Sequence, residues 1–139
     1  MLSDTLNTNE VKDAAGSAQA FERLYNNNRT TEFRLSAEVP STPHRLSIGH
    51  TEIGAGVKKR RRSVVRVDIK SVSDVDSTLV VSTLGYIVLD NPIGAVTSNA
   101  KAAECLANLM SFCASTGATT TILYDGTGNG CVSLLNGSL

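Results

Sequence analysis

The chain has 139 residues, with 13 Lys and Arg against 13 Asp and Glu, so its formal net charge is zero. That length is typical of one domain, and we expect a single domain over residues 1–139. Three Phe, three Tyr and no Trp are present, which predicts a core built from Val, Leu, Ile and Ala. Such a core is thin for a solitary domain and favours an oligomer whose subunits share apolar surface.

The N-terminal residues lack the charged and apolar regions of a signal peptide, and no apolar run approaches the length of a membrane span. We therefore expect a soluble protein made in a cytoplasm, with no membrane partner. The cysteines Cys105, Cys113 and Cys131 form no CxxC pair, and His44 and His50 are the two histidines. No zinc spacing appears, so we predict no metal and no cofactor. Buried reduced thiols are the simplest interpretation of the cysteines, with a disulfide between subunits as the alternative.

The first ninety residues have the pattern of strands separated by turn residues. Alternation or β-branched enrichment marks segments near 4–11, 20–26, 30–39, 44–53, 60–71 and 78–90. Consecutive strands with connections this short predict an antiparallel meander.

The segment 58–70 holds seven of the 13 Lys and Arg residues. No Asp or Glu lies between Glu52 and Asp68 to offset them. A period of two divides this segment into two faces, with Arg60, Arg62, Arg66 and Lys70 on one and Ser63, Val65, Val67 and Ile69 on the other. Clustered Lys and Arg gain affinity for nucleic acid by releasing phosphate counterions, so the first face predicts a nucleic-acid surface. A solvated charged face, a guard against edge-to-edge aggregation and a nuclear localisation signal are the alternatives.

After Asn91-Pro92 the period changes to that of a helix. Apolar side chains recur at Ala102, Leu106, Leu109 and Cys113. With Thr97 and Ser98 as candidate N-caps and Gly117 as a stop, we predict a helix over about 98–115. In the tail, 119–124 and 131–135 fit short strands around a glycine-rich turn, and a final short helix is the alternative.

Four short runs follow one another along the chain. They are the opening Ser-Asp-Thr-Leu, then Thr-Thr-Glu-Phe-Arg-Leu, then Arg-Val-Asp-Ile-Lys at the end of the basic strand, and finally Asn-Pro-Ile before Thr-Ser-Asn. In this order and spacing the chain resembles the coat proteins of single-stranded RNA bacteriophages, the levivirus type. The resemblance covers nearly the whole sequence.

The resemblance implies an α+β fold. An N-terminal β-hairpin and a five-stranded antiparallel meander sheet would occupy residues 1–92, and one or two C-terminal helices would occupy 97–139. Two subunits would join edge to edge, each helix crossing the partner's sheet. These homodimers would build an icosahedral shell, the virion, assembled in the cytoplasm of a bacterial host. The open sheet face would bind and package single-stranded viral RNA, and translational repression through an RNA hairpin is an open second role.

RNA-contacting positions of the family alternate along its last three strands. Aligned with this chain, they fall on Ser47, Gly49, Thr51, Arg60, Arg62, Val64, Arg66, Leu84, Tyr86 and Val88. Those with polar side chains are the predicted RNA-binding residues: Ser47, Thr51, Arg60, Arg62, Arg66 and Tyr86. The alternative function is a small dimeric β-sheet regulator that binds RNA or DNA and forms no shell. We predict no catalytic residues, because the sequence offers no positioned triad and no carboxylate motif.

Overall fold

The structure, a computed structural model, describes residues 4–6, 10–116 and 122–138. The described residues belong to two compact units, one containing 4–6 and 20–97 and the other containing 10–19, 98–116 and 122–138. Along the chain, the sheet unit gives way to the helical unit after Thr97. The sequence did not indicate that residues 10–19 belong with the helices.

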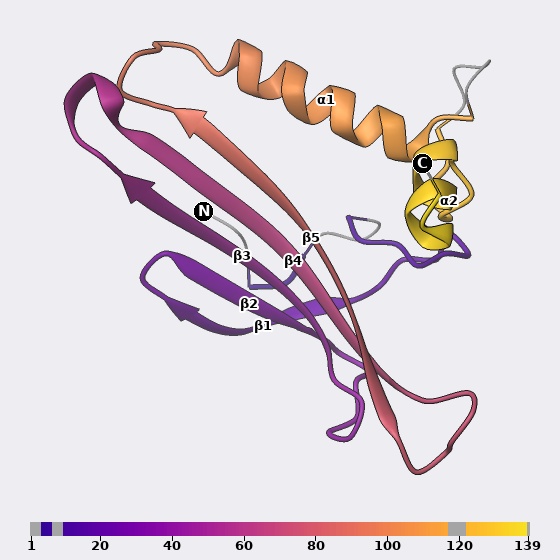
Figure 1. The fold of residues 1–139 in the computed structure, drawn as a ribbon. Coiled ribbons are helices and arrows are strands. Elements are labelled where there is room, and N and C mark those ends of the chain that lie inside the picture. The colour runs from indigo at the N-terminus through magenta and orange to yellow at the C-terminus, as the bar shows by residue number, and fades with distance from the viewer. Residues whose placement is uncertain (1–3, 7–9, 117–121, 139) are drawn as a thin grey trace. The chain divides into compact units, whose positions relative to one another are not determined.

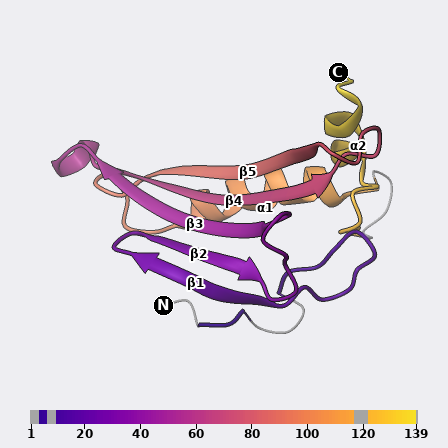
Figure 2. The same ribbon diagram turned by 90° about the horizontal axis from the view of Figure 1, so that it is seen from below.

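The first unit is a five-stranded antiparallel sheet in the order β1-β2-β3-β4-β5 (Figures 1 and 2). Its strands are β1 (Phe21–Asn27), β2 (Thr30–Leu35), β3 (His44–Ile53), β4 (Arg60–Val72) and β5 (Val80–Pro92). Each strand pairs with the one before it in the sequence, so the predicted meander is confirmed. Strand β2 ends earlier than predicted because the chain turns there, with Glu38 N–H donating to Leu35 O at 3.0 Å.

Among the described residues, the predicted N-terminal hairpin consists of isolated β-bridges and not of continuous strands. Thr5 bridges Glu22, and Lys12 bridges Ala18. The turn between Lys12 and Ala18 is held by Asp13, whose Oδ1 accepts hydrogen bonds from two backbone N–H groups of that turn at 2.9 and 2.8 Å. No continuous strand precedes β1 in the described part of the chain, and residues 7–9 of the predicted 4–11 strand lie outside that part.

The apolar core of the described residues consists of Phe21, Phe33 and Leu46. Phe33 pairs with Leu46 across β2 and β3, and the Phe21 ring meets the His44 ring edge-on at 5.2 Å. The prediction of a core of Val, Leu, Ile and Ala is therefore wrong in composition, since two phenylalanines fill it. Most aliphatic side chains of the sheet remain partly exposed, which favours association with other surfaces.

The second unit contains α1 (Ala100–Ala114) and α2 (Asn129–Asn136). Helix α1 has Asn99 as its N-cap, so the predicted caps Thr97 and Ser98 are too early in the chain. It ends because Ser115 is extended and bridges Ile122. The predicted stop at Gly117 lies outside the described residues. Neither helix in the described ranges is long and apolar enough to span a membrane.

The tail forms helix α2, so the strand predicted at 131–135 is wrong and the helical alternative is confirmed. The helix ends at Gly137, whose φ of +63° is the left-handed conformation that glycine adopts readily. Its glycines allow α1 and α2 to approach closely. A Cβ on Gly130 would lie 2.6 Å from the Phe112 ring, so this glycine serves helix packing.

The three thiols are free, and none is fully buried. Cys105 is exposed, whereas Cys113 and Cys131 are partly buried. The prediction of buried thiols is therefore wrong. Partial burial, then contact with Cys113, raises the pKa of the Cys131 thiol, so the folded tail brings these two cysteines together.

Candidate nucleic-acid interface

Cross-strand pairing decides which of the predicted RNA-binding residues share a face, because directly paired residues of an antiparallel sheet point to the same side. Ser47 of β3 pairs with Arg66 of β4, and Arg66 pairs with Tyr86 of β5. The three residues form one continuous row across the sheet. The Tyr86 side chain is 65% exposed, so its ring is accessible to a base that stacks on it.

A second row runs parallel to the first one. Thr51 of β3 pairs with Arg62 of β4, which pairs with Asp90 of β5. Arg62 is four residues from Arg66 on the same strand, and Arg60 is two residues further on, so the period of two keeps all three on one side. We call this side the arginine face. It carries all six predicted residues: Ser47, Thr51, Arg60, Arg62, Arg66 and Tyr86.

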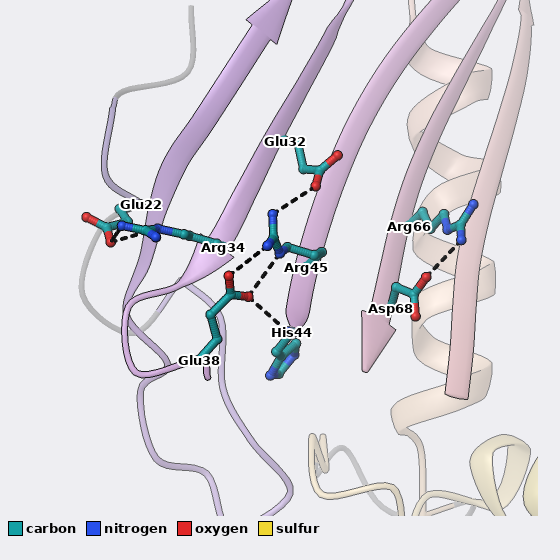
Figure 3. Close-up of polar contacts among 8 residues, drawn as sticks. All are labelled: Glu22, Glu32, Arg34, Glu38, His44, Arg45, Arg66 and Asp68. Atoms are coloured by element: carbon teal, nitrogen blue, oxygen red, sulfur yellow. Dashed lines mark hydrogen bonds and ion pairs between the residues drawn. The ribbon is translucent and has the colours of Figure 1, made fainter. Parts of the chain in front are cut away.

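Each of the three predicted arginines has a carboxylate partner on this face. Arg60 Nε donates to Asp90 Oδ1 at 2.7 Å, and Arg62 Nη2 lies 3.5 Å from Asp90 Oδ2. Arg66 Nη2 donates to Asp68 Oδ2 at 2.9 Å (Figure 3). The basic segment has no acidic residue before Asp68, but the strand pairing brings Asp90 to it from β5. The arginine face is therefore closer to charge balance than the sequence suggested.

Both carboxylates are held in the charged form. A hydrogen bond from Arg60 lowers the pKa of Asp90. The pKa of Asp68 is lowered first by the Ser82 hydroxyl, which donates at 2.9 Å, and then by Arg66. Any anion that binds these arginines must therefore compete with ionised carboxylates already in place.

A shallow hollow of about 230 Å³ lies on the arginine face, lined by Glu32, Arg45, Ser47, Arg66 and Asp68. Arg45 bridges two acids there, with Nη1 3.3 Å from Glu32 Oε1 and Nη2 2.8 Å from Glu38 Oε1 (Figure 3). Guanidinium donors and carboxylate acceptors together can contact both phosphates and base edges. Sequence reasoning missed Arg45, Glu32 and Asp68, which the alternation along β2, β3 and β4 would have placed here.

Three of the four remaining aligned positions form an apolar strip on the same face, whereas Leu84 pairs with Asp68 on the far side of the Ser47–Arg66–Tyr86 row. Gly49 pairs with Val64, and Val64 pairs with Val88. A Cβ on Gly49 would lie 3.2 Å from Thr30 Oγ1, so the glycine keeps the surface low at this point. The strip separates the Ser47–Arg66–Tyr86 row from the Thr51–Arg62 row.

Lys70 shares the parity of the arginine face, whereas Lys59 and Arg61 of the basic segment gather with Arg29 around Glu52. Lys59 Nζ lies 2.7 Å from its Oε2, Arg61 Nη2 lies 3.0 Å from its Oε1, and Arg29 Nη1 lies 3.4 Å from that oxygen. Hydrogen bonds from Lys59 and Arg61 lower the pKa of Glu52 to about 2. Among the described residues, no three His, Cys, Asp or Glu side chains gather as metal ligands would.

Solved structures of phage proteins share this arrangement of elements. The coat protein of bacteriophage EMS014 matches with a TM-score of 0.71 and 11% identity, over 100% of this chain and 99% of that one. The chain has the fold of bacteriophage coat proteins. The capsid protein of bacteriophage GA matches with a TM-score of 0.53 and 15% identity, over 88% of this chain and 86% of that one. A virus-like particle of bacteriophage AVE015 matches with a TM-score of 0.53 and 16% identity, over 86% and 80% of the two chains.

These likenesses confirm the predicted fold class, a meander sheet followed by C-terminal helices of the phage coat type. The sequence itself matches no protein-family model and no curated protein. The likeness therefore lies in the fold, and it persists although only 11–16% of the residues are identical.

Proposed function

We propose that this chain is a capsid subunit, a structural protein that forms homodimers, assembles into a closed icosahedral virion shell and packages single-stranded RNA. The observation that carries the proposal is the likeness to the EMS014 coat protein along nearly the full length of both chains, with a TM-score of 0.71. Other similar structures are described as a virus-like particle and a capsid protein, so their fold serves shell building.

The two edges of the sheet differ in a way that supports a dimer. Strand β1 has seven residues, and residues 4–6 already cover its outer edge, where Thr5 bridges Glu22 and Leu6 N–H donates to Phe21 O. Strand β5 has 13 residues, and within the described sheet it pairs with β4 alone. A long regular edge strand binds another strand readily. We therefore infer that β5 pairs with β5 of a second copy.

RNA packaging is assigned to the arginine face. The side chains of Arg60, Arg62 and Arg66 are 49%, 54% and 49% exposed, so phosphates reach them without a change of the backbone. A phosphate replaces a carboxylate as the partner of each guanidinium, and the binding releases counterions from the RNA. Translational repression would need, in addition, selective binding of one RNA hairpin.

Expression of the chain alone in bacteria, followed by gel filtration and electron microscopy, tests the proposal. We expect closed particles that contain host RNA protected from added nuclease. A protein that binds RNA yet elutes as a dimer at all concentrations would instead be the small regulator. Cleavage of labelled RNA in the presence of a divalent metal would contradict the structural role. A reporter gene preceded by candidate hairpins tests repression separately.

A further inference from the structure

The β4–β5 connection, residues 73–79, is an ordered turn. Ser73 Oγ accepts hydrogen bonds from the N–H groups of Val75 and Asp76 at 3.2 and 3.3 Å. Asp76 Oδ1 accepts from the N–H and the hydroxyl of Thr78 at 2.9 and 2.6 Å. Ser73 N–H donates to Leu79 O at 2.8 Å and closes the turn. The turn therefore presents its outer side chains in a fixed arrangement.

Those outer side chains are a valine between two acids. Val75 is 98% exposed, and Asp74 and Asp76 flank it, with no Lys or Arg between residues 71 and 79. Hydrogen bonds from Thr78 lower the pKa of Asp76, which keeps it charged. We call this feature the acidic knob. A valine held out in water on an ordered turn gains nothing within its own chain.

The opposite end of the same strands has the complementary character. The β3–β4 connection and the neighbouring β1–β2 turn bring together Arg29, Lys59 and Arg61 around the single carboxylate of Glu52, and Lys58 precedes Lys59 in the same connection. Two apolar side chains, Val57 and Ile53, are 72% and 58% exposed there. A hollow of about 670 Å³ opens next to the Glu52 cluster, lined by Asn27, Asn28, Arg29, Thr30, His50, Thr51, Glu52 and Lys59. We call this region the basic end.

The basic end is also ordered. Gly54 has a φ of +84°, and a Cβ on it would lie 2.8 Å from Lys58 O, so the β3–β4 connection is folded tightly. Lys59 O accepts hydrogen bonds from the N–H groups of Ile93 and Gly94, both at 3.0 Å. These contacts fix the cations relative to the sheet, so the basic end is a preformed surface.

The knob and the basic end cannot meet within one copy. They lie at opposite ends of β4 (Figure 1). That strand has 13 residues, so the two ends are about 40 Å apart at 3.3 Å per residue. Contact between them therefore requires two copies of the chain.

We propose that the acidic knob of one copy docks on the basic end of another, with Val75 against Val57 and with Asp74 and Asp76 facing Lys58 and Lys59. The contact joins two different patches, so it is heterologous and continues from copy to copy until the assembly closes. Opposite charges fix its register and speed association. The inference rests on the proposed shell for its biological role, where it links one dimer to the next. RNA bound at the basic end would explain the cations but would leave the knob unexplained.

A charge exchange tests the contact in the full chain. Asp74→Lys and Lys58→Glu, which leave the turn contacts of Asp76 and the ion pair of Lys59 in place, should each lower the yield of particles by about tenfold or more, the effect of about 1.4 kcal/mol per contact. The dimer peak should be retained in both. The chain carrying both substitutions should recover particles, because the attraction is restored with reversed signs. Failure of the combined variant to recover particles, with a folded dimer by circular dichroism, would count against the proposal.

A cross-link gives a second readout that does not depend on charge. Val57→Cys/Val75→Cys should form a disulfide-linked ladder of chains on oxidation, and each single substitution should show the pattern of the native chain. The native chain run beside these variants also gives the background from the three cysteines already present. Closed particles without a ladder would overturn the contact and leave the shell standing. A ladder without closed particles would keep the contact and refute the shell. A product that stops at two chains would show that the contact is confined to one dimer and would overturn the proposed linkage.

Discussion

The β1–β3 part of the sheet and the β4–β5 hairpin use their side chains in opposite ways. The three buried hydrophobic residues of the described chain, Phe21, Phe33 and Leu46, lie on β1, β2 and β3. Strands β4 and β5 form the longest ladder, with 13 paired positions, yet neither contains a buried side chain. The hairpin pairs β4 with β5 along its whole length and leaves its side chains and the outer edge of β5 for other molecules.

This division matches the proposed roles of the two regions. A two-stranded hairpin without hydrophobic burial is marginally stable in water. The β1–β3 core therefore supports the sheet, while the hairpin supplies the arginine face, the free β5 edge and the acidic knob. Variants in the two regions should consequently affect different measurements.

The largest effect is expected in the core. Phe33 is fully buried, so Phe33→Ala should lower the free energy of unfolding by about 3–5 kcal/mol. Leu84→Ala is the matched control, since Leu84 lies on the arginine face and is 47% exposed. Its cost should stay below about 1 kcal/mol. Urea unfolding at one fixed protein concentration compares them. Equal losses would show that the hairpin carries core of its own.

Dimerisation is the next largest effect. Leu109 of α1 is 41% exposed in the single chain, and in the proposed dimer it is covered by the partner's sheet. Leu109→Asp should weaken the dimer by about 3 kcal/mol, because the partner's surface would desolvate an unpaired carboxylate. Sedimentation at several concentrations measures this, with Lys101→Asp as the control on a side chain that is 91% exposed. An undiminished dimer in Leu109→Asp would place α1 outside the dimer contact.

Much of this architecture could be predicted from local pattern. The alternation of β4 places Arg60, Arg62 and Arg66 on one face, and that parity depends on neighbouring residues alone. The register then extends the face to Ser47, Thr51 and Tyr86. Their role in RNA binding stays a prediction.

The remaining features depend on contacts distant in the sequence. Asp90 is 30 residues from Arg60, so its neutralising effect becomes visible when β4 and β5 are paired. Composition could not show that phenylalanine fills the core, because the count of three Phe does not say where in the fold they lie. The sequence left the structure of the tail open because glycines such as Gly128 and Gly130 are typical of turns. In the structure these two glycines allow α2 to pack closely on α1.

The next largest effect is expected on RNA binding, from the loss of base stacking on Tyr86 of the β4–β5 hairpin. Tyr86→Ala should weaken RNA binding by about 1–3 kcal/mol, because the exposed ring no longer stacks on an unpaired base. The slope of log affinity against log salt should stay unchanged, since stacking releases no counterion. Tyr124→Ala, a change of another exposed tyrosine on the second unit, is the control. An unaltered affinity in Tyr86→Ala would place the binding surface elsewhere.

The arginines should show the opposite signature. Arg62→Ala should weaken binding to most RNA sequences and reduce the salt slope by about 0.7–0.9, the value of one phosphate contact. Filter binding at a series of salt concentrations measures both quantities. Arg61→Ala is the matched control, because Arg61 lies on the opposite side of β4 and pairs with Glu52. A slope that falls equally in both variants would mean that positive charge acts without regard to position.

The smallest effect is a gain, and it tests the charge balance of the hairpin. Asp90 occupies Arg60 and Arg62 before RNA arrives, so its carboxylate opposes phosphate binding. Asp90→Asn keeps the shape and removes the charge. RNA affinity should rise by about tenfold or less, and the salt slope should steepen by about 0.7–0.9 if one more phosphate is bound. Glu104→Gln, which removes the partner of Lys101 on α1, controls for net charge. A loss of affinity in Asp90→Asn would show that the carboxylate orients the arginines for RNA, and that its ion pairs are part of the binding surface.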